Sequence, residues 1–329
     1  MNTDNALQRR LVTIPAAVLG FVVVSLTMPA LLVLALAVDA VRAIVADKPA
    51  VTTRLVVFLW LYLLGEVWAL AAMAVVSLLP AGRSLDLTFR LQSAWVSWNF
   101  TWMSRVFGLS FSVEGLDQVA PPPILVLSRH ASTVDTLLPA RYVTRHHGIR
   151  LRYVLKKELL VDPALDLGGN RLPNHFVDRR SPDSGDEVAA IRELAVDLPD
   201  SQGVVIYPEG TRFDAAKRDR AVARLGRSGG PVAELAVGYR RVMPPRPAGT
   251  LALLDATAAD VVVLAHRGLE GFARVKDMWS GGLIGSRVEV RLWRVPRTEI
   301  PEGRSQRIEW LYRLWADVDA WVCRRGIDG

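Results

Sequence analysis

A histidine and an aspartate capable of acid–base chemistry lie just past a short apolar run at 124–127. His130 and Asp135 are five residues apart. On one helix such residues would point about 140° away from each other, whereas in a turn between a strand and a helix they can meet. A carboxylate bonded to one imidazole nitrogen fixes the tautomer and leaves the other nitrogen free to take a proton from an alcohol. The spacing therefore predicts a general base in such a turn.

A second motif supplies positive charge at the end of another apolar run, 203–207. It reads Glu209-Gly210-Thr211-Arg212, and Pro208 and Gly210 predict a tight turn. Guanidinium groups bind phosphate oxygens well. Between the two motifs, Phe176 and Val177 lead into Arg179. A lone arginine is most often a solvated surface residue, but several of them at strand ends, beside a histidine and an aspartate, favour phosphate binding.

These blocks, in this order, resemble the lysophospholipid acyltransferase family, which includes the 1-acylglycerol-3-phosphate and lysocardiolipin acyltransferases. The resemblance covers about residues 122–271. The family's His-x4-Asp, aromatic-aliphatic-x-Arg and Glu-Gly-Thr-Arg blocks are matched by the residues above, and a fourth block is matched loosely at 261–268. The chain departs from the pattern at Arg129, where the family often has asparagine, and at 264–268, which lacks the usual proline.

The resemblance implies an O-acyltransferase with His130 and Asp135 as its catalytic pair. His130 would deprotonate a hydroxyl of a lysophospholipid, with 1-acyl-sn-glycerol 3-phosphate favoured and phosphatidic acid as the product. That hydroxyl would attack the thioester of acyl-CoA or acyl carrier protein. Lysocardiolipin and lysophosphatidylglycerol stay open as other acceptors.

The resemblance also implies the binding residues. Arg179 and Arg212 would hold the acceptor phosphate, and Glu209 would position the acceptor or Arg212. Gly210 and Thr211 belong to the same binding motif. Neither a metal nor a cofactor is implied beyond the acyl donor as co-substrate.

The elements that position these residues indicate an α/β fold over 111–329. Apolar runs alternate with helical patterns, which is typical of a mostly parallel sheet flanked by helices, with sites at the carboxyl ends of its strands. The predicted strands are 124–127, 151–155, 203–207, 261–265 and 286–295, the helices 185–198 and 308–322, and the polar loops 178–186 and 213–230.

An N-terminal membrane hairpin is predicted over 1–84. Leu11 to Val38 runs for 28 residues without a charge, and a second apolar stretch is broken only by Glu66. About 20 apolar residues cross a bilayer, so the hairpin either spans the membrane or enters one leaflet. Arginines flank its outer ends, which indicates a cytoplasmic face for the catalytic domain. These are Arg9, Arg10, Arg83 and Arg90. Glu66 is a functional carboxylate, is hydrogen-bonded to the partner helix, or lies near the headgroups because the hairpin inserts only shallowly.

Three tryptophans at helical spacing follow the hairpin. Trp95, Trp98 and Trp102 predict an interfacial amphipathic helix over 85–110, with a core-packing stripe as the alternative.

Composition favours lipid over nucleic acid as the partner. The net charge is +7 and 51% of the residues are hydrophobic. A basic chain with an apolar N-terminus suits anionic lipid headgroups.

A serine hydrolase would need a Gly-x-Ser-x-Gly elbow, and 108–112 fails at the last position. A non-catalytic lipid-binding protein remains the alternative of another class, although it has no use for His130. The other histidines lack metal-ligand spacing and are expected to be packing or surface residues. They are His146, His147, His175 and His266.

Overall fold

The computed structural model describes residues 5–46, 49–178, 184–227, 229–272 and 275–324. The chain forms two compact units. The first comprises Met1–Ser110, Leu155–Ser181 and Lys276–Ser286, and the second comprises Phe111–Val154, Pro182–Val275 and Arg287–Gly329. Segments 155–181 and 276–286, which the sequence assigns to the α/β domain, thus group with the N-terminal helices.

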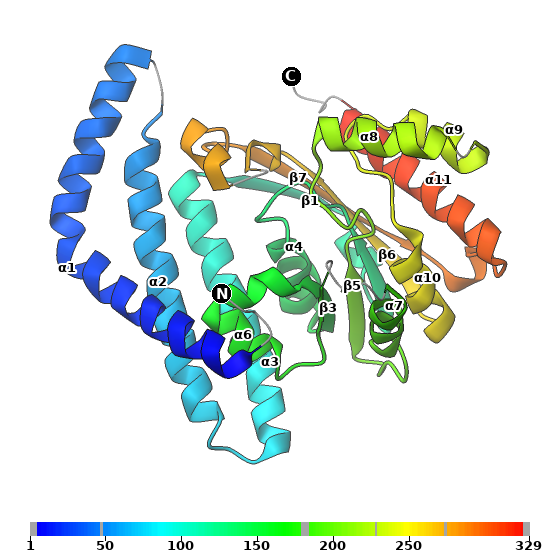
Figure 1. Cartoon of the computed structure of the whole chain (residues 1–329), viewed down its shortest axis with the longest axis horizontal. Coiled ribbons are helices and arrows are strands. Elements are labelled where there is room, and N and C mark those ends of the chain that lie inside the picture. The colour runs from blue at the N-terminus through cyan, green and yellow to red at the C-terminus, as the bar shows by residue number, and fades with distance from the viewer. Residues whose placement is uncertain (1–4, 47–48, 179–183, 228, 273–274, 325–329) are drawn as a thin grey trace. The chain divides into compact units, whose positions relative to one another are not determined.

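Three long helices make up most of the first unit (Figure 1). They are α1 (Ala6–Ala46), α2 (Val51–Val76) and α3 (Ala81–Phe107). Among the described residues, α1 and α2 are the helices long and apolar enough to cross a membrane, as the sequence predicts. Proline lacks the N–H that continues a helix, and α1, which visibly bends, contains Pro15 and Pro29.

Polar contacts join α2 to α3 within this unit. Glu66 is buried and accepts hydrogen bonds from the Trp95 indole at 2.9 Å and from a backbone N–H of α6 (Pro163–Gly169) at 3.2 Å. Trp98 donates to a backbone carbonyl of α2 at 2.9 Å, and a Cβ added at Gly65 would lie 2.8 Å from its indole. The tryptophan face of α3 therefore packs on α2, which favours the core-stripe alternative, and Glu66 is held by hydrogen bonds.

The start of α1 is anchored by a buried ion pair. Arg9 Nη2 lies 2.9 Å and Arg10 Nη2 lies 3.2 Å from Asp166 Oδ1, and the Asp166 side chain is fully buried. Arg9 is itself 3% exposed. This arginine, which the sequence places at the outer end of the hairpin, thus neutralises a carboxylate of α6 instead of facing solvent.

A mostly parallel sheet forms the core of the second unit. β2 (Ile124–Ser128) lies between β5 (Gln202–Ile206) and β6 (Asp260–Arg267) and is parallel to both. β3 (Arg150–Lys156) pairs with β5 in parallel, whereas β7 (Arg287–Val295) pairs with β6 antiparallel. The strand order is β1-β7-β6-β2-β5-β3, with β1 spanning Ser110–Glu114. All five residues of β2 are buried, as expected for a central strand covered on both faces.

Helices flank this sheet (Figure 1). α7 (Ser184–Glu193), α10 (Pro247–Ala256) and α11 (Arg304–Cys323) lie along one face, and α4 (Leu137–Pro139) lies on the other. The predicted α/β fold is therefore confirmed. The remaining short elements are η1 (Leu116–Gln118), the π-helix η2 (Ala140–Thr144), α5 (Arg145–His147), η3 (Lys157–Val161), β4 (His175–Val177), α9 (Pro231–Val237), η4 (Glu270–Phe272), η5 (Val275–Ser280) and η6 (Arg297–Glu299).

Three predictions about elements were wrong in detail. The loop expected at 213–230 contains α8 (Ala215–Gly226), a charge-rich helix without a fully buried side chain. The helix expected at 185–198 ends at Glu193. The helix expected to begin at 85 begins at Ala81, directly after Pro80. Helix ends depend on local capping more than on apolar spacing.

Candidate active site

The motifs meet at the carboxyl ends of three neighbouring parallel strands. Residues 129–136 follow β2, residues 207–214 follow β5, and residues 268–272 follow β6. Because β2 lies between the other two strands, its loop is bracketed by theirs. In α/β sheets this edge is where ligands and catalytic groups gather.

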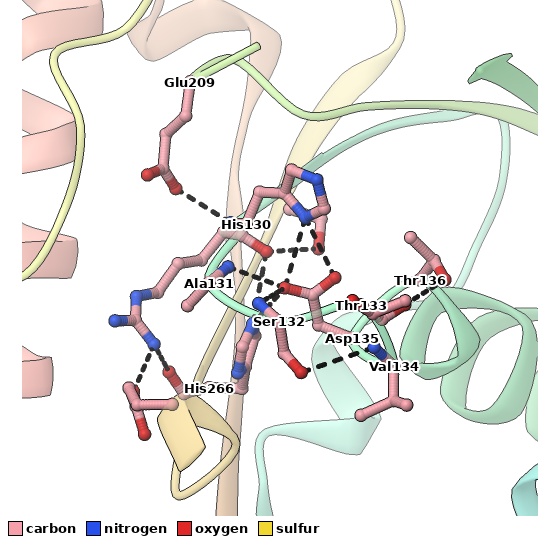
Figure 2. A network of polar contacts seen from close by, with 12 residues as sticks. His130, Ala131, Ser132, Thr133, Val134, Asp135, Thr136, Glu209 and His266 are labelled. Carbon is pink, nitrogen blue, oxygen red and sulfur yellow. Dashed lines mark hydrogen bonds and ion pairs between the residues drawn. The ribbon is translucent and has the colours of Figure 1, made fainter. Parts of the chain in front are cut away.

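His130 and Asp135 face each other within the loop after β2 (Figure 2). His130 Nδ1 lies 3.0 Å from Asp135 Oδ1 and 3.2 Å from Oδ2. Asp135 is fully buried, and the imidazole is 12% exposed. Asp135 sits in a turn two residues before α4, slightly ahead of the helical position that the sequence predicts. The predicted meeting of the two side chains therefore occurs, in a turn.

Asp135 also anchors the loop backbone. Its Oδ2 accepts the N–H groups of Ala131 at 2.7 Å and Ser132 at 2.8 Å (Figure 2). Burial acts to raise the pKa of Asp135, but the charge of His130 and hydrogen bonds from His130 and His266 outweigh it and hold the pKa below its usual range. An ionised Asp135 requires Nδ1–H on His130, which leaves Nε2 to take a proton.

Glu209 supports His130 through its backbone. Glu209 is 1% exposed, and its Oε1 accepts the N–H of His130 at 2.8 Å (Figure 2). Its Oε2 accepts the N–H of Met243, also at 2.8 Å. Burial raises the pKa of Glu209 to about 7, although the Arg129 charge and both backbone donors act in the opposite direction. The carboxylate thus positions the peptide of His130, while the acceptor-binding role given to Glu209 stays a prediction.

The turn after Glu209 brings Arg212 to the His130 loop. Gly210 has φ +62°, a conformation that side chains disfavour, and a Cβ there would lie 3.0 Å from Arg246. Arg212 donates to the hydroxyl of Thr133, and the N–H of the next residue, Phe213, donates to the His130 carbonyl at 2.9 Å. Hydrogen bonds therefore connect the Glu-Gly-Thr-Arg motif to the His-x4-Asp motif. Thr211 is half-buried.

Arg179 lies outside the described residues, so its phosphate-binding role stays a prediction. Phe176 and Val177, which precede it, form part of β4 in the first unit. Among the residues that the structure describes, no three His, Cys, Asp or Glu side chains gather as metal ligands do.

One Gly-x-Ser-x-Gly sequence does occur, at 226–230. It follows helix α8, whereas a nucleophile elbow follows a strand and begins a helix. Ser228 is not among the described residues. The motif therefore lacks the context that a serine hydrolase needs.

Two site residues were missed by the sequence reasoning. Arg129 has no exposed side-chain surface and donates to the His266 carbonyl at 2.6 Å, to Glu270 at 2.7 Å and to the Arg241 carbonyl at 2.9 Å. His266 Nε2 lies 3.3 Å from Asp135 Oδ2. The available signals were an arginine ending a buried strand and a histidine within another, both inside the segment that resembles a known family.

Comparisons with known proteins match the same segment. A family model described as "Acyltransferase" matches residues 110–263. The chain is 29% identical over 156 residues to a 1-acyl-sn-glycerol-3-phosphate acyltransferase of Pseudomonas aeruginosa, covering 45% of this chain and 54% of that protein. The chain thus spans about half the length of this curated relative.

A solved structure has the same fold. The crystal structure of the 1-acyl-sn-glycerophosphate acyltransferase PlsC from Thermotoga maritima aligns with a TM-score of 0.51 and 13% identity. The alignment covers 83% of this chain and 99% of that chain. It therefore includes elements of both units.

Proposed function

We propose that this chain, which belongs to the lysophospholipid acyltransferase family, is an O-acyltransferase that moves a fatty acyl group from a thioester to the free hydroxyl of a lysophospholipid. The observation that carries the proposal is the buried, ionised Asp135 on Nδ1 of a partly exposed His130. The name of the Pseudomonas relative supports 1-acyl-sn-glycerol 3-phosphate as the acceptor and phosphatidic acid as the product.

In the proposed reaction His130 is the general base. Its Nε2 takes the hydroxyl proton of the acceptor as the oxygen attacks the thioester carbonyl. The tetrahedral intermediate then collapses, the ester forms, and the thiolate leaves and receives the proton from the imidazolium. Asp135 holds the reactive tautomer and stabilises the imidazolium. General-base catalysis of this kind contributes about 10²–10⁴-fold, and a thioester is already activated toward attack.

Arg212 is the residue of the described chain that we assign to the acceptor phosphate. Its contact with Thr133 places the guanidinium beside the loop that carries His130 and Asp135. Guanidinium binds phosphate through paired hydrogen bonds, so an acceptor held there would have its glycerol hydroxyl near the base. Arg179 would supply a second cation.

We further propose that α1 and α2 bind the membrane, with the catalytic domain on the cytoplasmic face. Most of the apolar surface of α1 is exposed. Of the residues in its most apolar stretch 6% are buried, against 28% in the corresponding stretch of α2. Exposed apolar area of this length is stabilised by lipid. Arg83 and Arg90 near the start of α3 support the cytoplasmic orientation.

The test is an acceptor and donor panel with the full chain in detergent micelles. Labelled acyl-CoA and acyl-loaded acyl carrier protein are each offered to lysophosphatidic acid, lysophosphatidylglycerol, lysocardiolipin and glycerol 3-phosphate. We expect labelled phosphatidic acid from lysophosphatidic acid, and no product from the His130→Ala protein. Product from lysocardiolipin alone would replace the acceptor but keep the reaction. Product from no combination would refute the proposed function.

A further inference from the structure

The two places where the chain departs from the family pattern contact each other. Arg129 donates to the backbone carbonyl of His266 at 2.6 Å, and His266 Nε2 lies 3.2 Å from the backbone carbonyl of Arg129. His266 lies three residues past the end of the matched family segment, 110–263. Both side chains are fully buried. The departures therefore form one connected structure beneath the loop of His130.

The surroundings of His266 settle which of its nitrogens carries a proton. Nε2 faces two acceptors, the Arg129 carbonyl and Asp135 Oδ2 at 3.3 Å, so it carries a hydrogen. Nδ1 is buried and has no hydrogen-bond partner among the described residues. A proton on Nδ1 would add an unpaired buried donor and a buried charge, both of which are costly. The geometry thus fits the neutral Nε2–H imidazole.

We propose that His266 is a positioning residue for acyl transfer. Its Nε2–H donates to Asp135 and holds this carboxylate in place from the side that does not face His130. This inference rests on the proposed function of the site. Asp135 Oδ2 then receives His266 and the N–H groups of Ala131 and Ser132, while Oδ1 is left for His130 Nδ1 (Figure 2). The aspartate lies between two imidazoles, with one accepting the substrate proton and the other fixing the aspartate.

The position of His266 is itself secured by charge. The Arg129 guanidinium links the His266 backbone to Glu270, whose second oxygen accepts the N–H of Gly268 at 2.7 Å. Burial alone would raise the pKa of Glu270, but the adjacent Arg129 charge lowers it, so this carboxylate stays ionised. The Arg129–Glu270 pair thus pins the end of β6 to the end of β2, which is the geometry the His266–Asp135 contact needs.

A donor on Asp135 also changes how strongly the aspartate attracts a proton on His130. Sharing the carboxylate charge with His266 weakens that attraction, so removing the donor leaves the full carboxylate charge facing His130 Nδ1. The charged and titratable groups that face this cluster are Arg129 beside β2, Glu270 after β6, and Tyr207, Glu209 and Arg212 after β5. Removing the His266 donor leaves all of these in place.

The experiment compares His266→Gln with His266→Leu in the full chain. The amide nitrogen of glutamine replaces imidazole Nε2 as a donor, whereas leucine fills the space without one. His266→Asn, whose shorter amide reaches Asp135 less well, is a second donor-poor variant if leucine prevents folding. His147→Leu, a change at a histidine that contacts His146 instead of Asp135, is the matched control.

We expect the leucine variant to lose about 10- to 100-fold in kcat, with an unchanged KM for the acceptor. This is the loss usually seen when a group that orients a metal ligand is removed. In the pH profile of kcat, the fall in activity on the acid side moves to higher pH. Without the His266 donor, the full charge of Asp135 faces His130 and retains its proton more strongly. The glutamine variant keeps most of the wild-type kcat and profile. Equal losses in the glutamine and leucine variants, or no loss in either, would overturn the inference.

A second readout does not need turnover. In ¹⁵N-histidine-labelled protein, the His130 signals are assigned by their absence from the His130→Ala spectrum and then titrated. We expect the titration midpoint of His130 to move to higher pH in His266→Leu and to stay in His266→Gln and His147→Leu. Unmoved midpoints in His266→Leu would overturn the positioning role. Absence of acyl transfer in the wild type, with the midpoint shift present, would instead refute only the proposed function.

Discussion

The carboxyl of Glu209 offers a quantitative test of how the site is built. Burial raises its pKa from 4.5 to about 7. A carboxyl whose pKa rises on folding is held more favourably when protonated, so its contribution to the free energy of unfolding is fully present below about pH 4.5. That contribution is lost as the pH rises through about 7. At 1.36 kcal/mol per pH unit, the loss is about 3 kcal/mol.

Replacing Glu209 by glutamine removes this titration and keeps the size of the side chain. The amide oxygen accepts one of the two backbone hydrogen bonds, but the amide nitrogen meets the other donor, which costs about 1–3 kcal/mol. We expect the variant to be less stable than the wild type at pH 5 and about equal to it at pH 8. At about 2–4 °C per kcal/mol for a unit of this size, the difference in Tm changes by about 6–12 °C.

The assay is thermal unfolding of the full chain in detergent at pH 5, 6, 7 and 8, followed by tryptophan fluorescence. Asp219→Asn on α8 makes the same carboxylate-to-amide change at a side chain that is 65% exposed, so its Tm difference from the wild type is expected to stay flat. A difference between Glu209→Gln and the wild type that is constant from pH 5 to 8 would refute the reasoning. It would mean that Glu209 keeps one protonation state throughout.

Three other substitutions test the remaining contacts. His130→Ala is expected to abolish acyl transfer while co-sedimentation with liposomes persists, and full activity in that variant would contradict the mechanism. Arg212→Ala is expected to raise the acceptor KM by about 10- to 100-fold, the value of a hydrogen bond to a charged group, whereas Arg224→Ala on α8 leaves it unchanged. An unaltered KM in the first would count against the phosphate role. Arg9→Ala leaves the buried Asp166 with the Arg10 cation and the Asn170 amide, and is expected to cost about 1–3 kcal/mol at pH 7. Burial raises the pKa of Asp166, but the two arginines lower it overall, so this cost shrinks as the pH falls below 3.8. The exposed Arg90→Ala serves as its control.

Local sequence predicted the His130–Asp135 contact because one turn decides it. The two residues lie five positions apart, and a turn directly after a strand brings their side chains together. The strands themselves were predicted for a similar reason, since the residues of β2 are all buried and its first four form an unbroken apolar run. Both inferences depend on the nearest neighbours in the chain, which is where pattern reasoning is strongest.

Helix α8 was missed because charged residues outnumber large apolar ones along it. Its partly buried residues recur at helical spacing, but among them only Val222 and Leu225 are large apolar side chains. It begins at an N-cap, with Asp214 Oδ1 accepting the N–H of Lys217 at 3.0 Å. An aspartate before a run of alanines and arginines is a capping signal, and giving it more weight than the high charge of the segment would have predicted the helix.

The roles of Arg129 and His266 could not be read from the sequence because strand order creates them. Arg129 and His266 are 137 residues apart, and they meet because β6 pairs with β2 in parallel, with Ser128 opposite Leu264. Parallel pairing brings the carboxyl ends of both strands to one edge, so the residues just beyond the pair must share space. An arginine there, without surface exposure, needs a charge partner, and Glu270 provides it. The neighbouring imidazole then lies within reach of Asp135.

The same edge receives Glu209 from β5 on the other side. Support for His130 thus divides by strand: β5 holds its backbone through Glu209, and β6 holds its aspartate through His266. Substitutions on the two sides are accordingly expected to differ in kind, with Glu209→Gln changing stability with pH and His266→Leu changing the titration of His130.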